Sequence, residues 1–193
     1  PKGFKIHYDF NEDSNFEAVY PVIRELQKFS VAGRIEDPIR SIDDDGYRLL
    51  REKCTLPIII HHGPHEYFMK HGLCDGFMAG HAPVGKAMKV AAIAESNNTP
   101  FMLQQVGGII NQAFLAHEAA VFPMATLDHV NGSHLWKEDV IREKMPVVGG
   151  SIAVPKGPGL GITLDHQKLN QLAEASRPKQ TRFLVRVRYT SGL

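Results

Sequence analysis

Six short apolar segments recur along the chain, and nearly every one ends in polar side chains. They are Phe4–Phe10, Ala32–Ile35, Leu56–Ile60, Gly76–Ala79, Pro100–Leu103 and Met124–Leu127. The residues between successive segments show helical spacing of their apolar side chains. Near-continuous apolar runs of this length are typical of parallel strands that are buried on both faces. The alternation therefore predicts an α/β protein with a parallel sheet and right-handed crossovers.

The polar residues at the strand ends favour a (β/α) TIM-type barrel, because such barrels build their active sites at the carboxyl ends of the strands. Periodicity alone does not separate a barrel from an open, doubly wound sheet. A closed barrel usually takes about 250 residues, whereas this chain has 193 and begins at Pro1. We therefore expect the chain to be the later part of a larger protein.

The character of the sequence changes near Pro146, where glycine and proline become frequent. We interpret residues 1–145 as a partial barrel domain and residues 146–193 as a C-terminal segment of turns and short extended pieces. Residues Leu164 to Ala175 could form a last short helix.

Composition argues against several classes of partner. The net charge is +1, and the one basic stretch, Arg177–Arg188, alternates with apolar residues, which favours a solvated strand face over a nucleic-acid surface. No apolar run approaches about 18 residues, so we expect no membrane span. Cys54 and Cys74 are too few for a disulfide scaffold and fit free thiols in a reducing cytoplasm.

Asp9 and Glu36 follow successive strands, so a barrel would bring the two acids side by side at its mouth. Converging carboxylates repel unless a proton or a cation lies between them, and a divalent metal is a natural occupant. The alternative is that these acids cap a helix or form a salt bridge at a strand end.

The third strand ends in a histidine cluster that includes His61, His62 and His65. Imidazoles bind metals or move protons near neutral pH, although such a cluster is also common in surface loops. Imidazole suits Zn, Mn, Fe or Ni better than Mg. The later strand ends supply His81, Gln104 with Gln105, and Asp128 with His129.

Several motifs resemble the barrel domain of the enolase superfamily, in particular the mandelate racemase/muconate lactonizing enzyme group. They are Tyr8-Asp9-Phe10-Asn11, Ile35-Glu36-Asp37-Pro38, Leu56-Pro57-Ile58 leading to His62, Cys74-Asp75-Gly76-Phe77, Lys89–Glu95, and Gly157–Gly161 with Asp165. The resemblance covers nearly the whole chain from the third barrel strand onward. It implies that a capping domain and two strands precede Pro1.

The resemblance also implies a function. In this family a divalent metal, usually Mg, is held at the ends of the third, fourth and fifth strands. The metal stabilises the enediolate that forms when a base removes the proton α to a carboxylate. Carried over to this chain, the metal ligands are Asp9, Glu36 and His62. Because His62 replaces an acid, Mn, Zn or Fe are possible in place of Mg.

The chain departs from the family pattern at both visible base positions. The acid expected after the sixth strand of the family's barrel, which is the fourth strand of this chain, falls at Gly80. The histidine expected after the seventh barrel strand, the fifth strand of this chain, falls at Gln104 or Gln105. The remaining candidates for proton transfer are His61 and His81. We expect Asp128 to orient the substrate, and we expect substrate contacts from a further set of polar residues. These are Asn11, Gln104, Gln105 and His129.

The sequence therefore predicts a metal-dependent enzyme that acts on a small carboxylate substrate and forms a homo-oligomer. The expected reaction is dehydration of a sugar acid, or else racemisation or epimerisation. Two alternatives stay open: a homologue that has lost catalysis and serves as a binding or structural subunit, and a barrel hydrolase with a histidine-rich zinc site.

Overall fold

The computed structural model describes residues 3–80 and 84–175. The chain forms two compact units. One comprises residues up to 105 together with 118–131, and the other comprises 106–117 and the chain from 132 onward. The first unit contains the sheet and every described candidate for the site.

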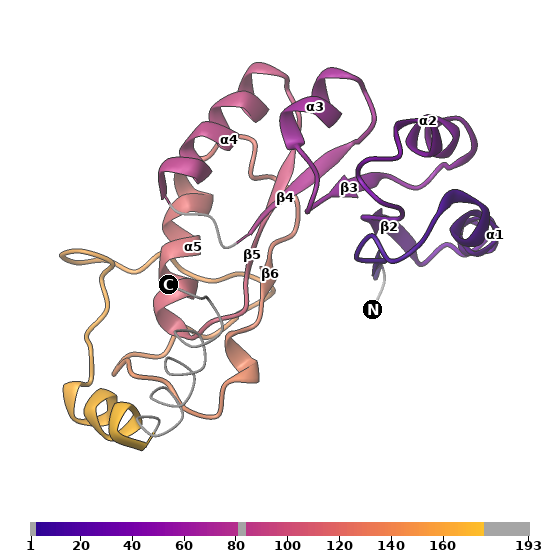
Figure 1. The fold of residues 1–193 in the computed structure, drawn as a ribbon. Coiled ribbons are helices and arrows are strands. Elements are labelled where there is room, and N and C mark those ends of the chain that lie inside the picture. The colour runs from indigo at the N-terminus through magenta and orange to yellow at the C-terminus, as the bar shows by residue number, and fades with distance from the viewer. Residues whose placement is uncertain (1–2, 81–83, 176–193) are drawn as a thin grey trace, which may run out of the picture. The chain divides into compact units, whose positions relative to one another are not determined.

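Within residues 3–80 and 84–175 the sheet has six strands in the order of the sequence, and every neighbouring pair is parallel (Figure 1). The strands are β1 (Ile6–Asp9), β2 (Ala32–Glu36), β3 (Ile58–Ile60), β4 (Gly76–Gly80), β5 (Phe101–Gln105) and β6 (Val130–Asn131). The helices between them are α1 (Phe16–Leu26), α2 (Asp44–Lys53), α3 (His65–Lys70), α4 (Val84–Ser96) and α5 (Ile109–Val121). Six parallel strands joined through helices confirm the predicted α/β barrel architecture.

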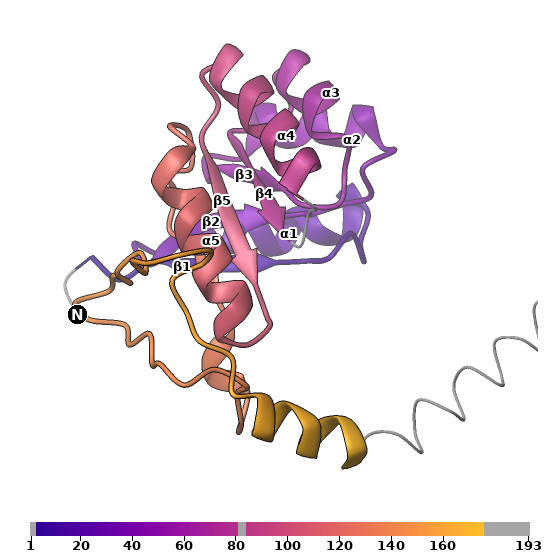
Figure 2. The ribbon, with the colours of Figure 1, turned by 90° about the vertical axis from the view of Figure 1, so that its left-hand side faces the viewer.

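The first two helices begin at side chains that satisfy their free backbone N–H groups. Asn15 accepts a hydrogen bond from the backbone N–H of Ala18 and starts α1, and Asp43 accepts one from Gly46 and starts α2. Helix α1 packs on α2, and α3 packs on α4. Figure 2 shows α2, α3 and α4 along one side of the strands.

The two faces of the sheet have different contents, because side chains alternate along each strand. The face covered by helices is filled by large apolar residues, including the stacked rings of Phe77 and Phe101, whose centroids lie 4.9 Å apart. The opposite face holds a smaller cluster of Ile59, Met78 and Met102, with Leu127 packed against it. Polar side chains follow this cluster toward the carboxyl ends of the strands.

The sixth strand differs from the prediction. Met124–Leu127 is not a strand, and the regular pairing with β5 falls at Val130–Asn131. The apolar run still lies along β5, because Phe101 donates a hydrogen bond to the carbonyl of Met124 and accepts one from the N–H of Leu127. These two partners are three residues apart, one more than a regular parallel ladder allows, so the extra residue bends the chain.

In the second unit the predicted turns are present. Gly149 and Gly150 both have positive φ angles, 57° and 81°, between Val148 and Ser151, which exchange two backbone hydrogen bonds. Residues 166–175 are helical, within the last helix expected from the sequence. The basic stretch Arg177–Arg188 lies outside the described residues. Within the described part of the chain, no helix is long and apolar enough to cross a membrane.

Candidate active site at the carboxyl ends of the strands

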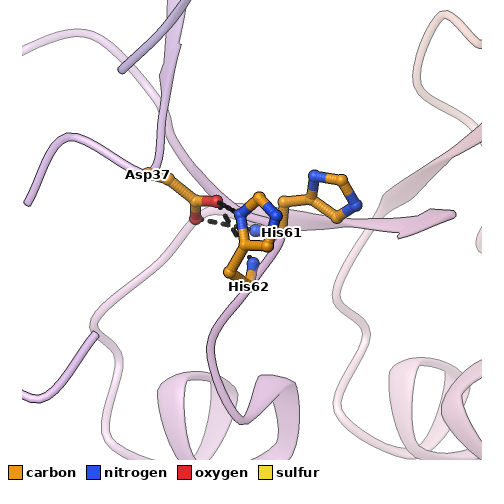
Figure 3. A group of neighbouring side chains, drawn as sticks. All are labelled: Asp37, His61 and His62. Atoms are coloured by element: carbon orange, nitrogen blue, oxygen red, sulfur yellow. Dashed lines mark hydrogen bonds and ion pairs between the residues drawn. The ribbon is translucent and has the colours of Figure 1, made fainter. Parts of the chain in front are cut away.

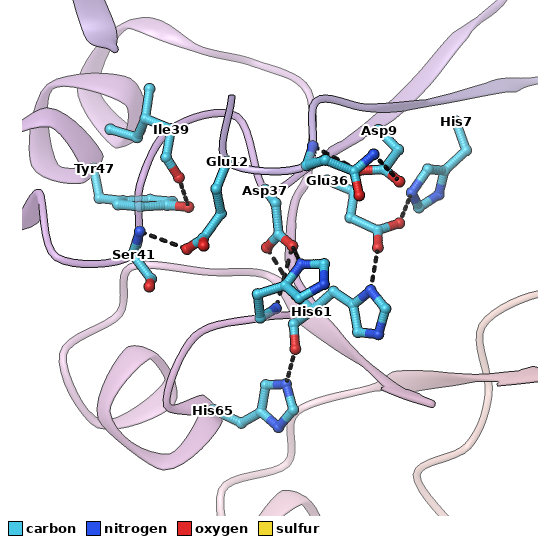
Figure 4. A network of polar contacts seen from close by, with 12 residues as sticks. His7, Asp9, Glu12, Glu36, Asp37, Ile39, Ser41, Tyr47, His61 and His65 are labelled. Atoms are coloured by element: carbon cyan, nitrogen blue, oxygen red, sulfur yellow. Dashed lines mark hydrogen bonds and ion pairs between the residues drawn. The ribbon is translucent and has the colours of Figure 1, made fainter. Parts of the chain in front are cut away.

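Glu36, the last residue of β2, is an almost fully buried carboxylate held between two imidazoles (Figure 4). Its side chain is 3% exposed, with Oε2 2.5 Å from Nε2 of His7 and Oε1 3.2 Å from Nδ1 of His61. Burial alone would raise the pKa of Glu36, but the hydrogen bonds from His61 and His7 outweigh it and lower the pKa to about 2. Glu36 therefore stays ionised at every physiological pH.

His61 presents its second ring nitrogen to the next strand. The hydrogen bond to Glu36 raises the pKa of His61, and burial opposes this in part. A Cβ atom added to Gly80 would lie 3.4 Å from Nε2 of His61 and 3.2 Å from Oε1 of Gln104. That amide oxygen is buried and accepts no hydrogen bond from the described residues. The imidazole nitrogen and the amide oxygen thus face the space above Gly80, where the family pattern places an acid.

Asp37, the residue after Glu36, pairs with the other histidine of the cluster (Figure 3). Its Oδ2 lies 2.6 Å from Nδ1 of His62, and its carboxylate also accepts hydrogen bonds from the backbone N–H groups of His61 and His62. The Asp37 side chain is 1% exposed, whereas that of His62 is 48% exposed. The side chain of Glu36 therefore contacts that of His61, and the side chain of Asp37 contacts that of His62.

Asp9 ends β1 on the same face as Glu36, because the two residues are partners in the parallel register. Its side chain is exposed, and both carboxylate oxygens accept hydrogen bonds from Asn11, one from the backbone N–H and one from the side-chain amide. Asn11 has a left-handed φ of 51°, a conformation that asparagine adopts more often than most residues other than glycine. The amide of Asn11, predicted to contact substrate, orients Asp9 in this structure.

Gln105, at the end of β5, and His129, just before β6, both contact other residues of the sheet region. Gln105 is buried and donates a hydrogen bond to Asn131. His129 accepts a hydrogen bond from the N–H of Leu103 through Nδ1, and burial lowers the pKa of His129. Both side chains are therefore engaged in contacts within the protein.

Asp128 is fully exposed, and its carboxylate lies 3.4 Å from the guanidinium of Arg34. Arg34 is two residues before Glu36 on β2 and so lies on the same face of the sheet. His81, the other proton-transfer candidate, lies outside the described residues.

The donor chemistry fits a divalent metal. Carboxylates of Asp9 and Glu36 and a neighbouring imidazole form a mixed oxygen and nitrogen set, which suits Mn, Zn or Fe as well as Mg. Among the described residues, the group whose possible ligand atoms all lie within 4.8 Å of one another is Asp37, His61 and His62. The structure therefore brings His61 to Glu36 and His62 to Asp37, and it does not gather Asp9, Glu36 and His62 at that distance.

Two residues were missed in the sequence. His7 contacts Glu36 and lies two positions before Asp9. The alternation of side chains along a strand would have placed it on the same face as Asp9, the predicted metal ligand. Asp37 was passed over in favour of its neighbour Glu36, and only the fold shows that it faces the histidines.

Comparison with known proteins identifies the family. The family described as "Enolase C-terminal domain-like" matches residues 1–168. The chain belongs to this family. The predicted relationship to the enolase superfamily, in its mandelate racemase/muconate lactonizing enzyme group, is confirmed.

The relatives include enzymes with different reactions. The chain is 26% identical over 172 residues to a D-xylonate dehydratase of Haloferax volcanii, covering 84% of this chain and 40% of that protein. It is 30% identical over 155 residues to muconate cycloisomerase 1-2 of Acinetobacter lwoffii, covering 74% and 40%. The crystal structure of muconate cycloisomerase from Pseudomonas fluorescens has the same fold, with a TM-score of 0.78, 22% identity, and coverage of 86% of this chain and 48% of that one. The chain thus spans less than half the length of each of these three relatives.

Proposed function

We propose that this chain carries the barrel active site of an enzyme that removes the proton α to a carboxylate with the help of a divalent metal. The observation that supports this best is the position of His61 between Glu36 and the space above Gly80. In this proposal Asp9, Glu36 and His62 would hold the metal, and their ligand atoms, which do not all lie within 4.8 Å of one another in this structure, would have to come closer together around the ion. When bound, the metal supplies positive charge that offsets the negative charge developing on the substrate carboxylate.

In this proposal His61 is the base that removes the α proton, because the family's usual base positions are occupied by Gly80 and Gln104. Glu36 accepts a hydrogen bond from Nδ1 of His61, which leaves Nε2 of the neutral ring as the proton acceptor. The raised pKa of His61 makes its imidazole a stronger base than a free histidine. Gly80 has no side chain, so no side chain of that residue covers Nε2 of His61, which would lie 3.4 Å from a Cβ atom there.

We propose sugar acids as the substrate class and dehydration as the reaction, with racemisation or epimerisation as the alternative. The similarity to a D-xylonate dehydratase supports dehydration. After the α proton moves to Nε2 of His61, elimination requires an acid to protonate the leaving β-hydroxyl. The same protonated imidazole can return its proton to that oxygen if it lies on the same side of the substrate. Otherwise Asp128 or His81 is required.

Loss of catalysis remains the competing function, and Gly80 and Gln104 at the usual base positions favour it. Exchange of the substrate's α proton with solvent distinguishes an active enzyme from a homologue that has lost catalysis. The purified protein would be incubated in D₂O with a panel of aldonic and aldaric acids and Mg²⁺ or Mn²⁺, and the loss of the α-proton signal followed by NMR.

We expect metal-dependent exchange or dehydration of at least one acid, and a decrease of at least about 100-fold in His61→Asn, the size of a typical general-base contribution. His71→Asn, a change at an exposed histidine of the same unit, should leave the rate unchanged. Exchange that survives His61→Asn would remove His61 from the proton-transfer role. No exchange of any acid by a protein that binds metal would favour the non-catalytic subunit.

A further inference from the structure

Asp37 has a buried side-chain carboxyl group whose hydrogen bonds converge on the turn formed by His61 and His62. Its carboxylate receives the backbone N–H groups of His61 at 2.8 Å and of His62 at 3.2 Å, and Nδ1 of His62 at 2.6 Å. Its own backbone has a left-handed φ of 41°, an uncommon conformation outside glycine. The backbone is anchored on both sides, because Asp37 donates to the carbonyl of Ile59 and accepts from the N–H of Glu12.

These contacts determine which nitrogen of His62 carries the proton. The carboxylate form of Asp37 has no proton to donate, so it accepts all three of these hydrogen bonds. Against that carboxylate, Nδ1 of His62 is the donor, and Nε2 carries the lone pair in the neutral ring. The ring is 48% exposed, and its centroid lies 4.3 Å from that of His61, which contacts Glu36. The lone pair on Nε2 thus belongs to a half-exposed ring at the carboxyl ends of the strands.

We propose that Asp37 is a positioning residue that fixes the tautomer and the orientation of His62, so that Nε2 is the atom offered to the metal ion. A ligating histidine usually donates its other ring N–H to a carboxylate or carbonyl, which raises its basicity and holds the ring in place. Asp37 supplies that contact from a buried position. The last step, use of Nε2 by a metal, rests on the proposed function, whereas the tautomer of His62 does not.

The tautomer can be measured without metal or substrate. Long-range ¹H–¹⁵N spectra of metal-free protein labelled with [¹⁵N]histidine distinguish protonated from unprotonated ring nitrogens, and His62→Gln identifies the signals of His62 by their loss. In the wild type at a pH where the ring is neutral, we expect Nδ1 to be protonated. Nδ1 as the unprotonated nitrogen would overturn the proposal without any variant.

Asp37→Asn is the matching perturbation, because asparagine tolerates the left-handed conformation and keeps one acceptor oxygen. Asp45→Asn, at an exposed aspartate of α2, controls for the loss of one carboxylate. We expect Asp37→Asn to shift His62 toward the Nε2-protonated tautomer and to weaken Mn²⁺ binding about 10- to 100-fold by calorimetry. The control should change neither quantity.

Each outcome has a separate meaning. An unchanged tautomer in Asp37→Asn would overturn the positioning role, and a changed tautomer with unchanged Mn²⁺ affinity would overturn its connection to the metal. A wild-type protein that binds no Mn²⁺ would instead refute the metal in the proposed function, while the tautomer of His62 would still test the role of Asp37.

Discussion

The hydrogen bonds from His7 and His61 to Glu36 make a quantitative prediction about stability. Lowering the pKa of Glu36 from 4.5 to about 2 corresponds to about 3 kcal/mol, at about 1.4 kcal/mol for each pH unit. Because the folded-state pKa lies below the unfolded value, this stabilisation is fully present above about pH 4.5 and is lost as the pH falls toward 2. Linkage places roughly 2 kcal/mol of the loss between about pH 6 and pH 3.

The ion pair between Glu36 and His61 also makes stability depend on pH through His61, and here the stabilisation is lost as the pH rises. Its pKa is raised above the ordinary 6.5, so its contribution is fully present below that value and declines as the pH rises through the folded-state pKa. The stabilisation should therefore be greatest between about pH 4.5 and 6.5. It is one interaction seen from two partners, so the two contributions are not added.

The assay is urea unfolding of wild type and Glu36→Gln from about pH 3 to pH 8 in the presence of a chelator. We expect the stability gap between the two proteins to narrow by roughly 2 kcal/mol from pH 6 to pH 3. Glu52→Gln, at an exposed position of α2, should show no such trend. A gap that is constant over this range, or that widens in acid, would refute the assignment of Glu36 as an ionised carboxylate between two imidazoles.

Two further predictions concern the face of the sheet below and beside the site. Met102→Ala should destabilise the protein by about 2–5 kcal/mol in the same urea assay, because Met102 is 1% exposed in the cluster with Ile59 and Met78; a cost below about 1 kcal/mol would contradict that packing. Gly80→Ala should slow α-proton exchange with little change in Mn²⁺ affinity, because its Cβ enters the space beside Nε2 of His61; an unchanged exchange rate would mean that substrate does not use this space.

Most of the fold could be predicted from the sequence because buried parallel strands are continuously apolar. Five of the six segments contain strands close to their predicted positions. Met124–Leu127 has the same apolar character, yet its extra residue against Phe101 prevents a regular ladder. Apolar patterning reports burial, and it does not report whether backbone groups keep a regular register.

The site was harder to predict, because strand ends show which residues lie at the mouth and not which of them meet. The adjacent histidines His61 and His62 cannot be told apart by composition. The register that pairs Glu36 with Ile59 places His61, two residues further on, on the face of Glu36. His62, the next residue, contacts Asp37, whose backbone has a left-handed φ of 41° that the sequence does not reveal.

The central claim is that a divalent metal lies at this mouth and is held by the carboxylates that end β1 and β2. Asp9 offers the most direct test, because its side chain is exposed and its loss should leave the fold intact. Mn²⁺ binding would be followed by electron paramagnetic resonance for wild type and Asp9→Asn, with Asp13→Asn as the exposed control. The account predicts one Mn²⁺ per chain in the wild type and in Asp13→Asn, and affinity at least about 10-fold weaker in Asp9→Asn. Equal affinity in all three proteins, or no binding by the wild type, would contradict it.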